Sequence, residues 1–248
     1  MTPAVVRVAA VGDVHVGVDS GPVLGPPDVL AASADVLLIA GDLTRRGTGA
    51  EAHVLAAELA SVSVPVVVVL GNHDFESDAA VAVGDIMTEA GATVLDGDAT
   101  TVDIGGLRLG VAGTPGFGGG FVGASCAEFG EPLMKAFVGH TRRMAGALRT
   151  ALTDLDADIR IALTHYSPVE ETLAGERLEI YPFLGSYLLA EAIDAGGAQL
   201  AVHGHAHGGT RAGSTPCGVP VRNVTQPVLK RPFTVFRLGP AGLGDEPA

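Results

Sequence analysis

Residues 64–74 read VPVVVVLGNHD, an apolar run that ends abruptly at a short polar segment. The run has no alternation between apolar and polar positions and is rich in valine. Such a β-branched run predicts a strand that is covered on both faces, as in the parallel sheets of α/β proteins. Ligands bind these sheets beyond the carboxyl ends of the strands. Gly71-Asn72-His73-Asp74 therefore stands where a functional site is expected.

The same arrangement recurs along the chain. Four further apolar runs predict buried strands at residues 5–11, 34–40, 159–164 and 200–202. Helices are expected between the strands, at residues 48–60, 77–91, 135–152 and 186–195. A hairpin is expected at residues 100–112, and short strands at residues 219–224 and 233–238. This alternation predicts an α/β fold with a single domain over residues 1–240 and a short tail over residues 241–248.

Composition excludes several classes of protein. The 248 residues are 47% hydrophobic and 17% charged, which is incompatible with intrinsic disorder. The longest apolar runs are far shorter than the ~18 residues of a membrane span. With only Cys126 and Cys217, the chain is no disulfide scaffold, and without a visible signal peptide it is expected in the cytoplasm. A net charge of −13 makes extended nucleic-acid binding unlikely.

Polar residues follow all five predicted strands, and their side chains are of the metal-ligating kind. The candidate ligands are Asp13, His15, Asp42, Asn72, His165, His205 and His207. Asp13 and His15 are two residues apart, as are His205 and His207. In extended backbone the members of such a pair point to the same side, so both could reach one site. Carboxylate, amide and imidazole ligands without thiolate suit manganese, iron, cobalt, nickel or zinc. Seven ligands are too many for one ion and suit two, an arrangement that is used in phosphoryl chemistry.

The order of these motifs resembles the signature of the calcineurin-like metallophosphoesterase superfamily. The motifs are Asp13-x-His15, Gly41-Asp42, Gly71-Asn72-His73-Asp74, His165 and Gly204-His205-Ala206-His207. The resemblance implies a four-layer α/β/β/α sandwich and a dinuclear centre of divalent or trivalent ions, manganese, iron or zinc foremost. It also implies that a hydroxide bridging the two ions is the nucleophile.

The resemblance implies a role for each residue of the motifs. Asp13, His15 and His207 would hold one ion, Asn72, His165 and His205 the other, and Asp42 would bridge them. His73 would act on the leaving group as a general acid or hydrogen-bond donor, and Asp74 would orient the His73 ring.

The resulting prediction is a hydrolase of small phosphoesters, with phosphodiesterase favoured and cyclic nucleotides or nucleotide-linked diesters as possible substrates. Two alternatives stay open, namely a phosphomonoesterase of the same fold and a non-catalytic scaffold for protein contacts. A Ser/Thr protein phosphatase is disfavoured, because those enzymes lack the Gly204-His205-Ala206-His207 ending. The oligomeric state is not indicated.

Several residues outside the motifs have two interpretations. Phe117, Phe121 and Phe129, in the glycine-rich segment 113–130, either form a wall of the substrate pocket or belong to a loop. His203 is either a partner of the metal ligands or a buried strand residue. Arg45 and Arg46 either contact phosphate or are solvated. His53 and His140 are expected to be surface or packing residues.

Overall fold

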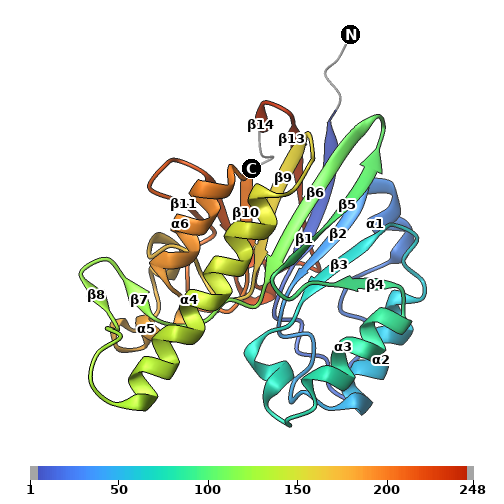
Figure 1. Cartoon of the computed structure of the whole chain (residues 1–248). Helices are drawn as coiled ribbons and strands as arrows, with labels where there is room; N and C mark the ends of the chain where they lie inside the picture. The colour runs from blue at the N-terminus through green and yellow to red at the C-terminus, as the bar shows by residue number, and fades with distance from the viewer. Residues whose placement is uncertain (1–4, 245–248) are drawn as a thin grey trace.

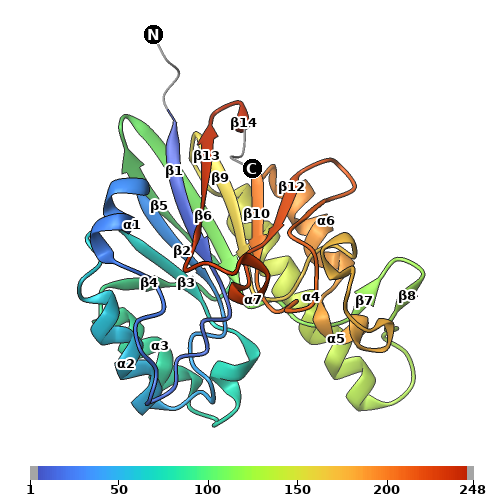
Figure 2. The same ribbon diagram turned by 180° about the vertical axis from the view of Figure 1, so that it is seen from behind.

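A computed structural model describes residues 5–244. Two mixed six-stranded sheets lie face to face, with helices on the outer side of each (Figure 1). The rear view in Figure 2 shows the same layering, with α1–α3 beside one sheet and α4 and α6 beside the other. This is the predicted α/β/β/α sandwich.

The first sheet is built mainly from the amino-terminal part of the chain. Its strand order is β14-β13-β1-β2-β3-β4, in which β1 to β4 run parallel and β13 lies antiparallel to β1. The strands are β1 (Val6–Val11), β2 (Val36–Ala40), β3 (Val66–Val69), β4 (Ala92–Val94), β13 (Thr234–Gly239) and β14 (Gly242–Leu243). The helices beside it are α1 (Pro27–Ser33), α2 (Gly49–Leu59) and α3 (Ala80–Glu89).

The second sheet has the order β11-β12-β10-β9-β6-β5. Its strands are β5 (Asp98–Ile104), β6 (Leu107–Thr114), β9 (Ile159–Thr164), β10 (Leu200–His203), β11 (Ala212–Ser214) and β12 (Pro220–Asn223). Its helices are α4 (Pro132–Thr153) and α6 (Tyr187–Gly196). Shorter elements lie in the connections, namely η1 (Asn72–Phe75), β7 (Gly120–Phe121), β8 (Ala124–Ser125), η2 (Glu171–Leu173), η3 (Leu178–Ile180), α5 (Tyr181–Leu184) and α7 (Gln226–Leu229).

Residue size separates the two faces of the second sheet. Its inner face carries large aliphatic side chains such as Val111, Ile161 and Val202, which join the core between the sheets. Its outer face carries small residues at the alternate positions, Ala112, Ala162 and Ala201, which pack under α4 and α6. Alternation of large and small side chains along a strand thus lets helices approach one face closely while the other fills the space between sheets.

Most predicted elements are present, with differences at their ends. Thr48 and Glu51 form the predicted capping box of α2. The predicted cap of the next helix at Ser77 or Asp78 is wrong, because α3 starts at Ala80 and no side chain caps it. Asp78 instead has a left-handed backbone, with φ of 54°. Hydrophobic periodicity does not reveal such turn geometry.

The segment predicted as a carboxyl-terminal tail is partly structured. Its residues 242–243 pair with β13, and residues 245–248 lie outside the described residues. None of the described helices is long and apolar enough to cross a membrane.

Candidate metal centre

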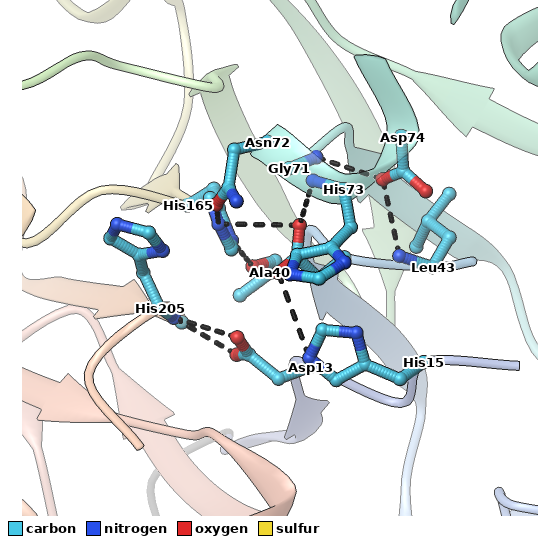
Figure 3. Close-up of polar contacts among 12 residues, drawn as sticks. Asp13, His15, Ala40, Leu43, Gly71, Asn72, His73, Asp74, His165 and His205 are labelled. Atoms are coloured by element: carbon cyan, nitrogen blue, oxygen red, sulfur yellow. Dashed lines mark hydrogen bonds and ion pairs between the residues drawn. The ribbon is translucent and has the colours of Figure 1, made fainter. Parts of the chain in front are cut away.

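The predicted ligands converge because five strands end at the same edge of the sandwich. Asp13 follows β1, Asp42 follows β2 and Asn72 follows β3, whereas His165 and His205 follow β9 and β10 of the other sheet. Residues separated by up to 194 positions in the chain are brought into hydrogen-bond contact there. Figure 3 shows the side chains of Asp13, His15, His165 and His205 gathered around one space. The edge predicted from the strand ends is the edge on which the side chains meet.

The backbone at this edge is left-handed at several residues that are not glycine. The φ angles are 58° at Asp13, 43° at His15, 49° at Asp42 and 70° at His205. The expectation of extended backbone between neighbouring ligands is therefore wrong. Left-handed conformations at non-glycine residues are uncommon and collect at functional sites, where surrounding contacts hold them. Here they turn carboxylates and imidazoles back over the strand ends.

Two glycines leave room for the carboxylates. A Cβ atom at Gly204 would lie 2.5 Å from Oδ2 of Asp13 and from the carbonyl oxygen of Ala40. At Gly71, a Cβ atom would overlap the backbone nitrogen and the carboxylate of Asp42. Both glycines are therefore needed for the close approach of one strand end to another.

A first group of side chains consists of Asp13, His15, Asp42 and His207. Each offers one ligand atom, and these atoms all lie within 4.8 Å of one another. Nε2 of His207 lies 2.8 Å from Oδ1 of Asp13, and Nε2 of His15 lies 3.6 Å from Oδ2 of Asp42. The backbone N–H of His205 donates to both oxygens of Asp13, at 3.0 and 2.9 Å, and holds that carboxylate in place.

A second group consists of Asp42, His165 and His205, whose ligand atoms again lie within 4.8 Å of one another. Asn72 adjoins this group, with its Oδ1 2.8 Å from Nε2 of His165. Asp42 belongs to both groups and is buried. The structure thus brings together all seven candidate ligands in two groups that share one carboxylate.

The protonation of two histidines makes them suitable ligands. Nδ1–H of His165 donates to the carbonyl of Ala40 at 2.9 Å, so Nε2 of the neutral ring is unprotonated. Nε2–H of His205 donates to the carbonyl of Phe183 at 3.2 Å, which leaves its Nδ1 unprotonated. Burial lowers the pKa of each ring to about 3, so both are neutral near pH 7. Backbone carbonyls thus determine which nitrogen of each ring is free to coordinate a metal ion.

The second group fits a cation in its donor chemistry. Unprotonated Nε2 of His165 faces Oδ1 of Asn72 at 2.8 Å and Oδ1 of Asp42 at 3.5 Å. All three atoms present lone pairs, and lone pairs at such separations repel one another unless a positive charge lies among them. Nitrogen and oxygen ligands of this kind suit a first-row transition metal.

The first group has a different charge state. Burial raises the pKa of Asp13 to about 6, although its hydrogen bond with His207 opposes this shift. The same hydrogen bond raises the pKa of His207. The hydrogen bond thus favours a proton on His207 beside the Asp13 carboxylate, and a metal ion bound to both residues would displace that proton.

His73 lies beside the ligands and points its ring toward them. Its ring centroid is 4.6 Å from that of His15, and its backbone N–H donates to Oδ1 of Asp42 at 2.8 Å. Nδ1–H of His73 donates to the carbonyl of Arg45 at 2.7 Å. The ring is thus oriented by a backbone oxygen, and its Nε2 remains available to a substrate.

The hydrogen-bond partners of Asp74 are not those expected of a residue that orients the His73 ring. Its buried carboxylate accepts hydrogen bonds from the backbone N–H groups of Leu43, Thr44 and Gly71, at 3.1, 2.8 and 2.8 Å. The hydroxyl of Thr44 donates to it as well, at 2.6 Å. Asp74 therefore ties the loop after β2 to the loop after β3, and so positions Asp42 and Asn72 through the backbone.

Other residues with two interpretations now have definite places. His203 is buried and bonds to Thr172 and to the carbonyl of Gly204, as expected for a buried strand histidine. Arg45 directs its guanidinium to Asp19 at 3.1 Å. Phe121 is buried in a separate cluster, and Phe129 is 84% exposed.

Sequence reasoning missed several groups that shape the centre. The carbonyls of Ala40, Arg45 and Phe183 orient three of its histidines. Backbone atoms carry no residue-type signal, so no sequence pattern could have identified them. Tyr166, whose ring centroid lies 4.5 Å from that of His205, was detectable only as the residue that follows His165.

Comparison with known proteins gives the fold and the family. A family model described as calcineurin-like phosphoesterase matches residues 6–209. No curated protein matches the chain. A phosphopantetheinyl hydrolase from Mycobacterium tuberculosis has a similar structure, with 16% identity, a TM-score of 0.64 and 88% of each chain covered. A putative 5′-nucleotidase from Staphylococcus aureus has 15% identity and a TM-score of 0.60, over 98% of this chain and 53% of the nucleotidase. At these identities the structures share the fold.

The family match extends over all seven candidate ligands, from Asp13 to His207. The two Asp/His groups are consistent with the dimetal site typical of that family. The chain therefore belongs to the calcineurin-like phosphoesterase family.

Proposed function

We propose that this protein is a metal-dependent hydrolase of small phosphodiesters. The observation that carries the proposal is the close approach of Nε2 of His165 to Oδ1 of Asn72 and Oδ1 of Asp42, beside a second Asp/His group. Two such sites that share a carboxylate can hold a pair of ions that activates water and binds a phosphoryl group.

We assign Asp13, His15 and His207 to one ion, Asn72, His165 and His205 to the other, and Asp42 to both. When bound, a pair of transition-metal ions supplies an activated water near neutral pH and neutralises charge on the phosphoryl oxygens. Manganese, iron and zinc all suit these ligands.

His73 would assist departure of the leaving group. Its Nδ1–H is donated to the carbonyl of Arg45, so in the protonated ring Nε2–H is the free donor. Oε2 of Glu76 lies 3.7 Å from Nδ1, on the side of the ring away from that donor. A proton transferred from Nε2 to the leaving alkoxide would make the product alcohol.

Charge favours a diester over a monoester. A diester carries one negative charge. A monoester carries about two near neutral pH, like the phosphate group of a phosphorylated side chain. Arg45, the cationic residue nearest the ligands in sequence, directs its guanidinium to Asp19 rather than into the centre. The two bound ions would offset the negative charge of Asp13 and Asp42, and Arg45 adds no further positive charge there for the second charge of a monoester. The less charged substrate is therefore the better match.

The test compares kcat/KM for bis-p-nitrophenyl phosphate and p-nitrophenyl phosphate with manganese-loaded protein. A clear excess for the diester supports the proposal, and the reverse would make the protein a phosphomonoesterase. Asp42→Ala should lose both bound metal and turnover, whereas Asp85→Ala, an exposed aspartate on α3, should retain both. Protein that takes up no metal and cleaves neither ester would instead be a scaffold.

A further inference from the structure

A cavity of about 340 Å³ opens beside the second ligand group. Asn72 lines it, and so does Tyr166, the residue after His165. The remaining walls include Phe75, Phe117, His140 and Met144. Because one wall contains a metal ligand, a molecule whose phosphoryl group lies at the metal centre can extend into this cavity.

The walls are aromatic and are held in place by neighbouring rings. The ring centroid of Phe117 lies 4.6 Å from that of His140, 4.9 Å from that of Phe137 and 5.7 Å from that of Tyr166. The Tyr166 ring in turn lies 4.5 Å from the ring of His205. These tilted and edge-to-face contacts are the favoured geometries of aromatic pairs. A preformed aromatic surface therefore runs from the cavity to the metal ligands.

The cavity is almost without charge. Asp96 is the only charged side chain among the described residues that line it, and Asp96 is exposed at the surface. Burial, assisted by Arg143, lowers the pKa of His140, so this ring is neutral near pH 7. Neither lysine nor arginine is present among those lining residues to bind a second anionic group. An uncharged group is what this lining can accommodate.

We infer that the cavity binds an uncharged aromatic substituent of the phosphoester, so that the preferred substrates are aryl- or heteroaryl-bearing esters. The inference rests on the proposed function for its link to catalysis, whereas the binding surface itself is independent of it. A flat ring that enters the cavity would pack against Phe117 and Tyr166 and leave its phosphoryl group near Asn72. Small aliphatic esters would not make this contact with the two rings.

The first test measures binding of 2-naphthol to the metal-free protein, with the fluorescence of the naphthol as the readout. Binding should weaken about tenfold or more in Phe117→Ala, which corresponds to a modest loss of aromatic contact. Phe129→Ala is the matched control, because Phe129 lies in the same glycine-rich segment and is 84% exposed. Unchanged binding in Phe117→Ala would overturn the inference.

A second variant guards against misfolding. Phe75 is 50% exposed at the mouth of the cavity, so Phe75→Ala is expected to fold and to weaken 2-naphthol binding by a smaller factor. Thermal unfolding followed by circular dichroism identifies which variants are folded. If Phe75→Ala and Phe117→Ala are both folded and both bind 2-naphthol as tightly as the wild type does, the inference is wrong.

The link to the metal centre is tested by competition. On manganese-loaded protein, phenylphosphonate should displace 2-naphthol at a concentration about tenfold lower than methylphosphonate. Equal potency of the two phosphonates would overturn the assignment of the cavity to the substrate. If 2-naphthol binding depends on Phe117 but no phosphodiester is hydrolysed, the cavity stands and the proposed function fails. The two failures are therefore distinguishable.

Discussion

The Nδ1–H of His165 donates to the carbonyl oxygen of Ala40 at 2.9 Å, although the two residues are 125 positions apart. Ala40 is the last residue of β2 in one sheet, and His165 follows β9 in the other. This hydrogen bond joins the two sheets at the edge where the ligands meet. It also fixes which nitrogen of His165 faces Asn72 and Asp42.

Replacing His165 should remove one of the two metal sites. We expect His165→Ala to bind about one equivalent of manganese instead of about two, because Asp13, His15, Asp42 and His207 remain as a ligand group. Metal content of dialysed protein, measured by mass spectrometry, checks this. His53→Ala, at an exposed position on α2, should keep the wild-type content. Full occupancy in His165→Ala would mean that the residue is not a ligand.

A methyl group at Gly204 should damage the centre. Its Cβ would lie 2.5 Å from Oδ2 of Asp13 and from the carbonyl of Ala40, both of which are fixed by other contacts. We expect Gly204→Ala to lower the free energy of unfolding by about 1–3 kcal/mol and to weaken metal binding. Denaturant unfolding of the metal-free protein and metal titration measure the two effects.

Gly146 offers a matched glycine for comparison. It lies inside α4, and an added Cβ would meet nothing within 4 Å. Gly146→Ala should therefore stabilise the protein by about 0.5–1 kcal/mol without affecting metal binding. Similar unfolding energies for the two alanine variants would contradict the steric explanation.

Asp74 should act as a positioning residue. Asp74→Asn places an amide donor among three backbone N–H groups and the Thr44 hydroxyl, so at least one buried donor loses its acceptor. We expect a loss of about 1–3 kcal/mol in the free energy of unfolding, together with lower turnover. If Asp74 positions the loops, metal affinity should fall too, since Asp42 and Asn72 lie on them. A fall in kcat alone, with unchanged stability and metal affinity, would argue for direct action on the His73 ring.

The ion pair between Arg7 and Asp35 predicts a pH dependence. The Arg7 side chain donates to Asp35 and lowers the pKa of this carboxyl below the usual 3.8. A lowered folded-state pKa contributes stability above the unfolded value, and that stability is lost as the pH falls through the folded one. Asp35→Asn should thus cost about 0.5–1 kcal/mol at pH 7 and progressively less below pH 3.8.

Unfolding of metal-free protein by urea across this pH range measures the effect. Asp85→Asn, at an exposed position in the middle of α3, serves as the control, and it should show no such pH-dependent difference from wild type. A difference at Asp35 that stays constant down to the lowest pH would show that the charge of the carboxylate is not the cause.

Local sequence patterns were sufficient to predict many of the strands and helices of this structure. Valine-rich runs predict buried strands, and the capping box at Thr48 and Glu51 predicts the start of α2, because both depend on neighbouring residues only. The strand at residues 92–94 was not predicted, since its three residues are too few to show a period. The left-handed turn at Asp78 was missed because hydrophobic periodicity carries no information on turn geometry.

The sequence by itself determined the types of candidate ligand, their order and their place at the ends of five strands. The division that the family resemblance implies depends on tertiary structure, which places His207 beside Asp13 and His205 beside Asp42 and His165. Tertiary structure also decided which nitrogen of each ring is free, and it built the aromatic cavity from Phe75, Phe117 and His140. The physical reason is that ligand chemistry belongs to the side chain, whereas orientation depends on carbonyls and rings that only folding brings near.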